Sequence, residues 1–207
     1  MTRYDAVLFD LLTALLDSWS LWNAAAGNAT AGLRWRQRYL QLTYGATGYA
    51  PYEALVAQSA RDAGLTDHAA AVLVQQWDTI APWPETPGVL QRLAQRVPVG
   101  VVTNCSQELG MRAVARLGTP VRVAITAEQA GHYKPHPAPY QLAVEALGVP
   151  VSRVLYVAGS PFDLPGASAV GLDVIWHNRI GLSPLPQGPA PLAELRTLDD
   201  LPAWVGA

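Results

Sequence analysis

The sequence predicts an α/β protein with a doubly wound parallel sheet that is interrupted by a block of helices. Beyond residue 88, short apolar runs typical of buried strands alternate with segments of helical spacing. This alternation builds a parallel sheet with helices on both faces. Between residues 18 and 80, apolar positions keep helical spacing and no strand-like alternation appears. We therefore expect residues 1–17 and 81–207 to form a Rossmann-type core, with residues 18–80 as an inserted, all-helical cap.

The first strand is expected at residues 6–9, a short apolar run with Val and Phe that ends abruptly at Asp10. Gly27 and Gly64 are placed to end helices of the block that follows. Helices are expected in that block at residues 19–26, 33–44, 52–63 and 67–80.

Residues 81–88 carry three prolines, which stiffen a return linker because each disfavours helix at the residue before it. Strands and helices then alternate. Strands are expected at residues 99–102, 121–126, 154–157 and 173–176, and helices at residues 88–96, 106–117, 138–147, 165–170 and 198–204. Residues 184–191 are rich in proline and predict a loop.

The composition limits the classes of function. Of 207 residues, 50% are hydrophobic and 14% charged, and the formal net charge is −2, which argues for a sizeable core and against a nucleic-acid partner. No apolar run approaches the roughly 18 residues of a membrane span. Cys105 is the only cysteine, so no intrachain disulfide can form; it could be a nucleophile, but a small buried or half-buried thiol is expected. With no signal-peptide pattern, we expect a cytoplasmic monomer or homodimer that acts on a small molecule.

Chemically capable side chains follow the predicted strands. Asp10 ends the first, Thr103 and Asn104 end the second, Lys134 lies in a Pro-rich loop, and Asp163 follows the 154–157 strand. Carboxyl ends of parallel strands share one edge of a sheet, where ligands bind. Together these residues would supply a nucleophile, an oxyanion binder, a cation and a second acid, as covalent catalysis requires. Alone, Asp10 could equally cap a turn and Lys134 could be a solvated loop residue.

The order of these four motifs resembles the haloacid dehalogenase (HAD) superfamily over nearly the whole chain. The resemblance implies a doubly wound core with a cap, and Asp10 as a nucleophile that forms a covalent ester. The superfamily's phosphatases carry two further acids, at the positions of Leu12 and Gly159 here. A Mg²⁺-dependent phosphatase would have to hold its metal at the positions of Asp10, Leu12 and Asp163, and hard cations want oxygen ligands.

The 2-haloacid dehalogenase branch of the superfamily also lacks both acids and works without a metal. Arg36, within a Trp-Arg-Gln-Arg segment, matches the cap arginine that receives the departing halide there. Lys134 and Tyr140 stand six residues apart as in that branch, and Phe162 with Asp163 matches its aromatic–Asp pair. The resemblance implies a hydrolase that acts on a small carboxylic acid without a cofactor.

The chemistry agrees, because displacing a halide at carbon needs no general acid. It needs a nucleophilic carboxylate, an apolar pocket and a cation for the halide, and Lys134 would keep Asp10 ionised. We therefore predict catalytic roles for Asp10, Lys134, Asp163, Arg36 and Thr103, and substrate contacts from Leu11, Leu12, Asn104, Tyr140, Ser160 and Phe162. Arg36 could instead lie on a solvated helix face and Tyr140 could be a packing residue.

Several positions depart from the branch. Its Gly-Thr after the nucleophile is Thr13-Ala14 here, Ala158 replaces a serine, and Ser160 replaces an asparagine that positions the second-step water. These departures leave two alternatives to a dehalogenase open. One is a Mg²⁺-dependent phosphatase of a small phosphomonoester, and the other is a catalytically silent scaffold that binds a small carboxylate or a protein.

Overall fold

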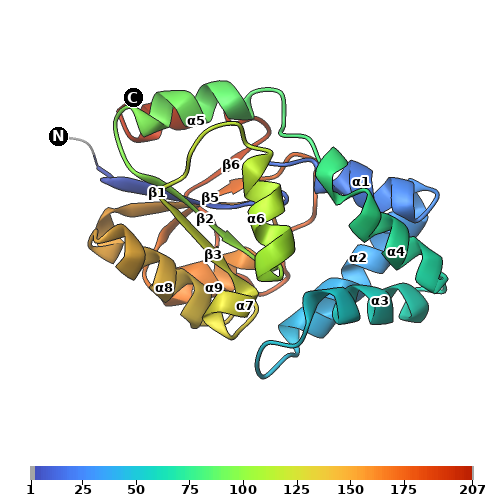
Figure 1. Ribbon diagram of the computed structural model, residues 1–207. Helices are drawn as coiled ribbons and strands as arrows, with labels where there is room; N and C mark the ends of the chain where they lie inside the picture. Colours follow the sequence, from blue (N-terminus) through green and yellow to red (C-terminus); the bar gives the residue numbers. More distant parts are fainter. Residues whose placement is uncertain (1–2, 207) are drawn as a thin grey trace.

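The computed structural model describes residues 3–206, and a six-stranded parallel sheet forms its centre (Figure 1). The strand order is β3-β2-β1-β4-β5-β6. The strands are β1 Ala6–Asp10, β2 Val99–Thr103, β3 Val123–Thr126, β4 Val154–Ala158, β5 Asp173–His177 and β6 Ala193–Leu195. The chain starts in the middle, winds to one side through β2 and β3, and then crosses to β4 on the other side. The doubly wound α/β class is thus confirmed, with the switch point between β1 and β4, where such sheets bind ligands.

Helices cover both faces of the sheet, which is why strands β1 to β5 are mostly apolar. On β1, Val7 and Phe9 face one core cluster, whereas Ala6 and Leu8 face the other. The first face is covered by α5 Thr86–Ala94, α6 Gln107–Ala115 and α10 Leu201–Trp204, and the second by α8 Pro137–Leu147 and α9 Asp163–Ala169. Short helices α7 Ala127–Ala130 and η2 Val151–Arg153 lie in the connections.

The chain between β1 and α5 is helical, as expected. Its elements are α1 Ser18–Ala25, α2 Ala29–Tyr44, α3 Tyr52–Asp62, α4 Asp67–Gln75 and the 3₁₀ helix η1 Trp77–Thr79. Figure 1 shows these helices gathered at one end of the sheet. A cluster of aromatic rings packs them together: Trp22 lies 4.6 Å from Trp35 and 5.4 Å from Tyr39, and Tyr52 lies 6.0 Å from Trp77, between ring centroids.

Two connections join this helical block to the sheet, and they run side by side in opposite directions. The amide of Asp17 donates to the carbonyl of Ala81 at 2.8 Å, and the amide of Trp83 donates to that of Leu15 at 3.0 Å. This pairing supports the proposed boundaries of a cap at residues 18–80 and a core at residues 1–17 and 81–207, which stay a prediction.

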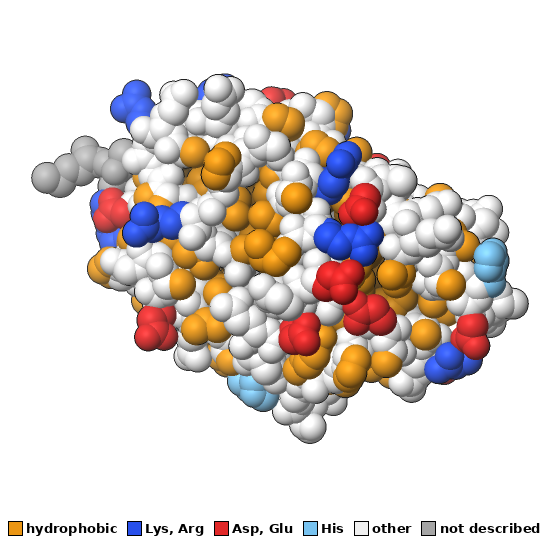
Figure 2. All heavy atoms as spheres, viewed as in Figure 1, with side chains coloured by type: hydrophobic (Ala, Val, Ile, Leu, Met, Phe, Trp, Pro, Cys, Tyr) orange, Lys and Arg blue, Asp and Glu red, His pale blue; other side chains and the backbone are white. Residues whose placement is uncertain are grey.

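The helical block also contacts α6 directly. Arg112 of α6 pairs with Asp78 at 2.9 Å, and the indole of Trp77 donates to the carbonyl of Leu109 at 2.8 Å. Figure 2 shows acidic and basic side chains gathered over this contact. Surface ion pairs contribute little to stability, so the buried aromatic cluster supplies most of the packing energy of the block.

The structure differs from the sequence predictions mainly at element ends. Helix α2 begins at Ala29 rather than residue 33, because the side chain of Asn28 accepts a hydrogen bond from the amide of Ala31 and caps it. Strand β6 was not predicted: its three residues, Ala-Glu-Leu, form an edge strand without an apolar run. The terminal helix is shorter than expected. In residues 3–206, no helix combines the length and apolar character that crossing a membrane requires.

Candidate active site

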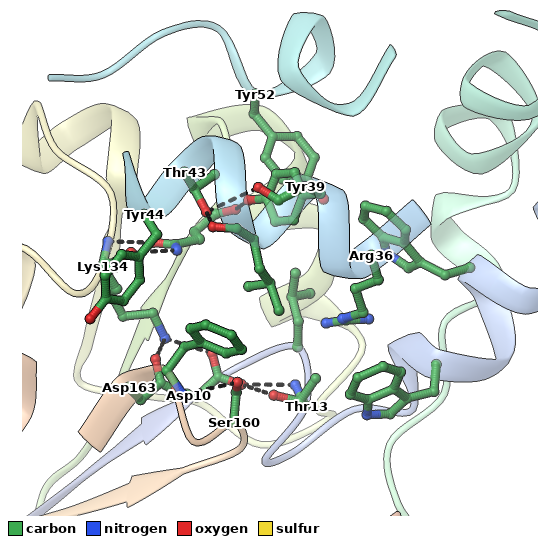
Figure 3. Close-up of a pocket in the computed structure, with 16 residues that line it drawn as sticks. Asp10, Thr13, Arg36, Tyr39, Thr43, Tyr44, Tyr52, Lys134, Ser160 and Asp163 are labelled. Atoms are coloured by element: carbon green, nitrogen blue, oxygen red, sulfur yellow. Dashed lines mark hydrogen bonds and ion pairs between the residues drawn. The ribbon is translucent and has the colours of Figure 1, made fainter. Parts of the chain in front are cut away.

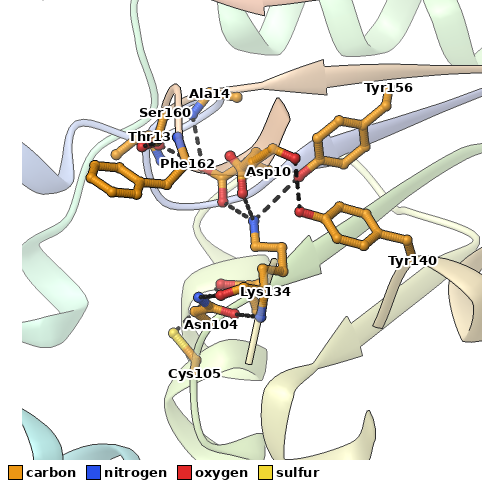
Figure 4. Close-up of polar contacts among 12 residues, drawn as sticks. Asp10, Thr13, Ala14, Asn104, Cys105, Lys134, Tyr140, Tyr156, Ser160 and Phe162 are labelled. Atoms are coloured by element: carbon orange, nitrogen blue, oxygen red, sulfur yellow. Dashed lines mark hydrogen bonds and ion pairs between the residues drawn. The ribbon is translucent and has the colours of Figure 1, made fainter. Parts of the chain in front are cut away.

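Asp10 lies at the carboxyl end of β1, and the loop after it folds back to hold the carboxylate. Oδ2 of Asp10 accepts hydrogen bonds from the Thr13 hydroxyl at 2.6 Å, the Thr13 amide at 2.8 Å and the Ala14 amide at 3.2 Å (Figure 4). Oδ1 accepts from Nζ of Lys134 at 2.7 Å. Burial opposes ionisation, but Lys134 and the hydrogen bonds from Thr13 outweigh it, and the pKa of Asp10 stays below its usual value. Asp10 is therefore a buried, ionised carboxylate.

Lys134 bridges two carboxylates in the centre of the site. Its Nζ lies 2.7 Å from Oδ1 of Asp10, 2.9 Å from Oδ1 of Asp163 and 3.2 Å from the hydroxyl of Tyr156. Burial works against the ammonium, but these two carboxylates raise the pKa of Lys134. Asn104 holds the backbone of Lys134 from both sides: its Oδ1 accepts from the Lys134 amide at 2.7 Å, and its Nδ2 donates to the carbonyl at 3.2 Å. The lysine is fixed in charge and in position.

Asp163 at the start of α9 differs from Asp10 in its surroundings. Burial and the neighbouring charge of Asp10 raise its pKa, although Lys134 opposes the shift. Its Oδ2 is buried and has no hydrogen-bond partner among residues 3–206. Two carboxylates in one site, one with a lowered and one with a raised pKa, are suited to different roles: the first as a nucleophile and the second as a base.

The same residues test whether a magnesium ion fits. The ammonium of Lys134 lies between Asp10 and Asp163, where a cation bridging the two would sit. Leu12 offers no oxygen ligand, and a side chain at Gly159 would overlap the loop that follows Asp10. In the part of the chain that the structure describes, no three His, Cys, Asp or Glu side chains gather in a group that could hold a metal. The donor set does not fit a hard dication, which needs several oxygen ligands.

Arg36 of α2 reaches the site from the helical block (Figure 3). It is 7% exposed, and its Nη1 donates to the hydroxyl of Ser18 at 2.8 Å. The guanidinium lies over the rings of Trp19 at 4.2 Å and Trp22 at 5.3 Å. Burial lowers the pKa of Arg36, but guanidinium groups stay charged in proteins. No acidic side chain among residues 3–206 forms an ion pair with it, so its charge is available to an anion from outside.

A small cavity of about 50 Å³ separates Arg36 from Asp10. It has room for roughly three to five waters, and therefore for a molecule of few atoms. Phe162 and Tyr44 close one side with their rings 5.8 Å apart between centroids. Half of the lining residues are aromatic or aliphatic: Leu12, Trp19, Trp22, Tyr39, Leu40, Tyr44, Tyr52 and Phe162. Such a wall offers few hydrogen-bonding partners to water beside the carboxylate.

Most of the side chains that the sequence singled out meet at this cavity. It is lined by Asp10, Leu12, Arg36, Asn104, Lys134, Ser160, Phe162 and Asp163. Three others do not line it. Leu11 is fully buried in the core. Thr103 is buried too, with its hydroxyl 3.6 Å from the sulfur of Cys105. Tyr140 contacts the site only through the backbone, since its hydroxyl donates to the carbonyl of Asp163 at 3.2 Å.

Two contributors were not among the site residues predicted from the sequence. Thr13, which could restore the hydroxyl missing at Ala14 if the loop turned differently, donates its hydroxyl to Oδ2 of Asp10 at 2.6 Å. Tyr156 of β4 contacts Lys134, and a tyrosine within an otherwise apolar buried strand was the available signal, since its hydroxyl needs a partner.

Cys105 is buried, and burial raises the pKa of its thiol to about 12, so it is not a nucleophile near neutral pH.

Comparisons with known proteins agree with this geometry. The family model for haloacid dehalogenase-like hydrolases matches residues 7–177, which include Asp10, Arg36, Lys134 and Asp163. Haloacetate dehalogenase H-2 of Moraxella sp. (strain B) is 28% identical over 200 residues, covering 88% of this chain and 89% of that protein. (S)-2-haloacid dehalogenase H-109 of Pseudomonas putida is 28% identical over 223 residues, covering 99% of each.

Solved structures show the same fold. The crystal structure of an L-2-haloacid dehalogenase aligns with a TM-score of 0.88 and 28% identity over 100% of both chains. The L-2-haloacid dehalogenase from Xanthobacter autotrophicus, with chloropropionic acid covalently bound, aligns with a TM-score of 0.85 over 98% of each chain. At 22% identity, this second likeness shows the fold alone. With more than half of its residues matched by the family model, the chain belongs to the haloacid dehalogenase-like hydrolases.

Proposed function

We propose that this protein is a dehalogenase that hydrolyses small 2-haloacids with Asp10 as its nucleophile. One observation carries the proposal: across a small apolar cavity, the ionised Asp10 faces Arg36, a buried guanidinium without an acidic partner among residues 3–206. A nucleophilic carboxylate opposite an anion receiver is what displacement of a halide requires. The curated relatives, named as haloacetate and (S)-2-haloacid dehalogenases, support this choice.

In the first step, Oδ1 of Asp10 attacks C2 of the acid. We assign the attack to Oδ1, which accepts one hydrogen bond, from Nζ of Lys134, whereas Oδ2 accepts three from the loop that follows β1. A carbon–oxygen bond forms, and the carbon–halogen bond breaks with its electron pair on the halide. In this proposal Arg36 receives that halide in the cavity, where the aromatic side chains reduce the hydration of the carboxylate. Attack from the side opposite the halogen inverts C2.

In the second step, water attacks the carboxyl carbon of the Asp10 ester. Asp163 lines the cavity, and burial raises its pKa, so its carboxylate is the base that we assign to that water. The bond between the carboxyl carbon and Oδ1 breaks, and the leaving oxygen takes a proton as the 2-hydroxy acid departs. The sum is haloacid plus water to hydroxy acid, halide and one proton. Lys134 holds both carboxylates in place throughout, and Asn104 positions Lys134.

The isotope record of a single turnover tests this mechanism. With enzyme in excess over 2-chloropropanoate in ¹⁸O-water, the first product should carry unlabelled oxygen from Asp10, and the peptide containing Asp10 should gain the label. A general base would activate water directly, so ¹⁸O in the first product with an unshifted Asp10 peptide would overturn the ester mechanism. Asp10→Asn, which cannot form the ester in its amide form, serves as the control and should show no turnover.

A further inference from the structure

The peptide group that joins Thr13 to Ala14 is hydrogen-bonded at both of its ends. Its N–H, the amide of Ala14, donates to Oδ2 of Asp10 at 3.2 Å (Figure 4). Its carbonyl, on Thr13, accepts from the indole Nε1 of Trp83 at 3.0 Å. In a trans peptide the N–H and the C=O point in opposite directions, so a partner that fixes one end also fixes the other. Trp83 is therefore linked to Asp10 through a single peptide group.

Trp83 belongs to the return linker and reaches the loop after β1 from outside the cavity. Its side chain is 8% exposed and does not line the catalytic cavity. Its backbone amide also donates to the carbonyl of Leu15, and its ring lies 5.0 Å from the guanidinium of Arg179. Because Trp83 touches neither the cavity nor Asp10, any effect of its indole on the reaction has to pass through the backbone of the loop.

Two strands hold the same stretch of backbone from other sides. Nδ1 of His177, buried at the end of β5, lies 2.8 Å from the carbonyl of Ala14. That carbonyl belongs to the next peptide group, so Ala14 is held on both sides. Gly159, which follows β4, lies so close to the Thr13–Ala14 peptide that a side chain there would overlap it. These contacts limit rotation of the peptide and keep the amide of Ala14 directed at Asp10.

We propose that Trp83 is a positioning residue that orients the nucleophilic carboxylate through the Thr13–Ala14 peptide. The inference rests on the proposed function and deepens it by adding a residue outside the cavity. A carbonyl that accepts a hydrogen bond polarises its peptide, which strengthens the amide at the other end as a donor. That amide helps to hold Oδ2 of Asp10, so that Oδ1 keeps its place beside Lys134. A carboxylate that can rotate attacks more slowly, although the cavity that binds the substrate is unchanged.

Trp83→Phe tests the proposal, because it removes the indole N–H but keeps an aromatic ring and the backbone bond to Leu15. The readout is the rate of halide release in the first turnover with saturating 2-chloropropanoate, which reports formation of the ester. We expect this rate to fall by about three- to tenfold, the effect of one hydrogen bond. The substrate concentration that gives half of the maximal rate should stay unchanged.

Trp77→Phe is the matched control. The indole of Trp77 is buried and donates to the carbonyl of Leu109 at 2.8 Å, so this variant loses an equivalent bond away from the loop. Both variants should shift the midpoint of urea unfolding by similar amounts, but Trp77→Phe should release halide at the wild-type rate. Benzothienylalanine at position 83, which has the shape of tryptophan with a sulfur in place of the N–H, makes the same test without a change in packing.

A second readout needs no substrate. Hydrogen exchange of the Ala14 amide, followed by NMR in ¹⁵N-labelled protein, reports how firmly the peptide is held. Exchange should become about three- to tenfold faster in Trp83→Phe, relative to Trp77→Phe, because the peptide loses its fixed carbonyl.

The outcomes separate this inference from the proposed function. Wild-type halide release in Trp83→Phe, or an unchanged exchange rate at Ala14, would overturn the role of Trp83 and leave the proposed function intact. Equal losses of rate in Trp83→Phe and Trp77→Phe would show a general structural effect and also overturn it. No halide release by the wild type would overturn the proposed function, and the role of Trp83 in it would fall too.

Discussion

Lys134 and Arg36 are the two buried cations of the cavity, 5% and 7% exposed, and the protein surrounds them differently. Lys134, from the sheet side, lies within 2.9 Å of two carboxylates. Arg36, from the helical block, contacts the hydroxyl of Ser18 and the faces of two tryptophans. The charge of Lys134 is balanced by carboxylates, whereas the contacts of Arg36 with residues 3–206 are with a neutral hydroxyl and aromatic rings.

In the proposed mechanism, Lys134 holds the nucleophile, whereas Arg36 binds the ligand. A buried charge without a partner costs several kcal/mol, so a fold keeps one where a ligand of opposite charge repays the cost. Lys134 serves Asp10 and Asp163 whether or not substrate is bound. The negative charge of Asp10 raises the pKa of Arg36 across the cavity. A substrate carboxylate or a halide bound between them would neutralise the positive charge of Arg36. Variants of the two cations should therefore fail in different ways.

The largest effect is expected for Lys134→Met. Removing the ammonium leaves Asp10 and Asp163 as neighbouring buried carboxylates without a cation. We expect kcat to fall by about a thousandfold or more and the free energy of unfolding to fall by about 3–5 kcal/mol. Steady-state kinetics and urea unfolding measure both. Lys134→Arg keeps the charge and should recover much of the stability, so a stable Lys134→Met protein with wild-type turnover would contradict the role given to Lys134.

Arg36→Met should separate activity from stability. We expect kcat for 2-chloropropanoate to fall by about a hundred- to a thousandfold, because the halide loses its receiver. The free energy of unfolding should change by only about 1 kcal/mol. The variant loses the contacts of Arg36, but it also removes the cost of burying a charge without an acidic partner, and the two effects oppose each other. Arg38→Met, on the same helix but paired with Asp62 at the surface, is the control and should leave kcat unchanged. Unchanged kinetics in folded Arg36→Met would show that Arg36 does not receive the halide.

The pH profile should report the second carboxylate. Burial raises the pKa of Asp163 to about 6, and the ester-hydrolysis step needs its ionised form. Activity should therefore be full above this value and fall about tenfold per unit as pH drops below it. Asp163→Asn should slow the second step, so that mass spectrometry detects the ester on Asp10. A profile that stays flat down to pH 4.5 would remove Asp163 as the base.

The smallest effect is expected for chelation. Because Lys134 lies between the carboxylates and Leu12 offers no ligand, EDTA should leave kcat for 2-chloropropanoate within about twofold of its value. Added Mg²⁺ should change it no further. A loss of activity on chelation that Mg²⁺ restores would contradict the metal-free mechanism and favour the phosphatase alternative, which assays on small phosphomonoesters would then examine.

The sequence by itself determined the class of fold and the acidic and basic groups of the site. The apolar pattern of a strand and the residue that ends it can both be recognised from a few neighbouring residues. Because parallel strands bring their carboxyl ends to one edge of the sheet, the residues that end them are expected to lie together. Asp10, Lys134 and Asp163 could therefore be assigned to one site, although 124 residues separate Asp10 from Lys134. The helical block could be predicted in the same way, because the spacing of apolar residues in a helix is visible within a short stretch of sequence.

The tertiary structure decided which way each side chain points and what surrounds it. Leu11 and Thr103 adjoin site residues in sequence, yet they face the core, because the turn after a strand depends on distant packing. The tryptophans under Arg36 come from the neighbouring helix α1, whereas Phe162, on the wall of the same cavity, comes from a loop more than 100 residues away in sequence. No local pattern encodes this arrangement, since it results from how the helical block packs against the sheet.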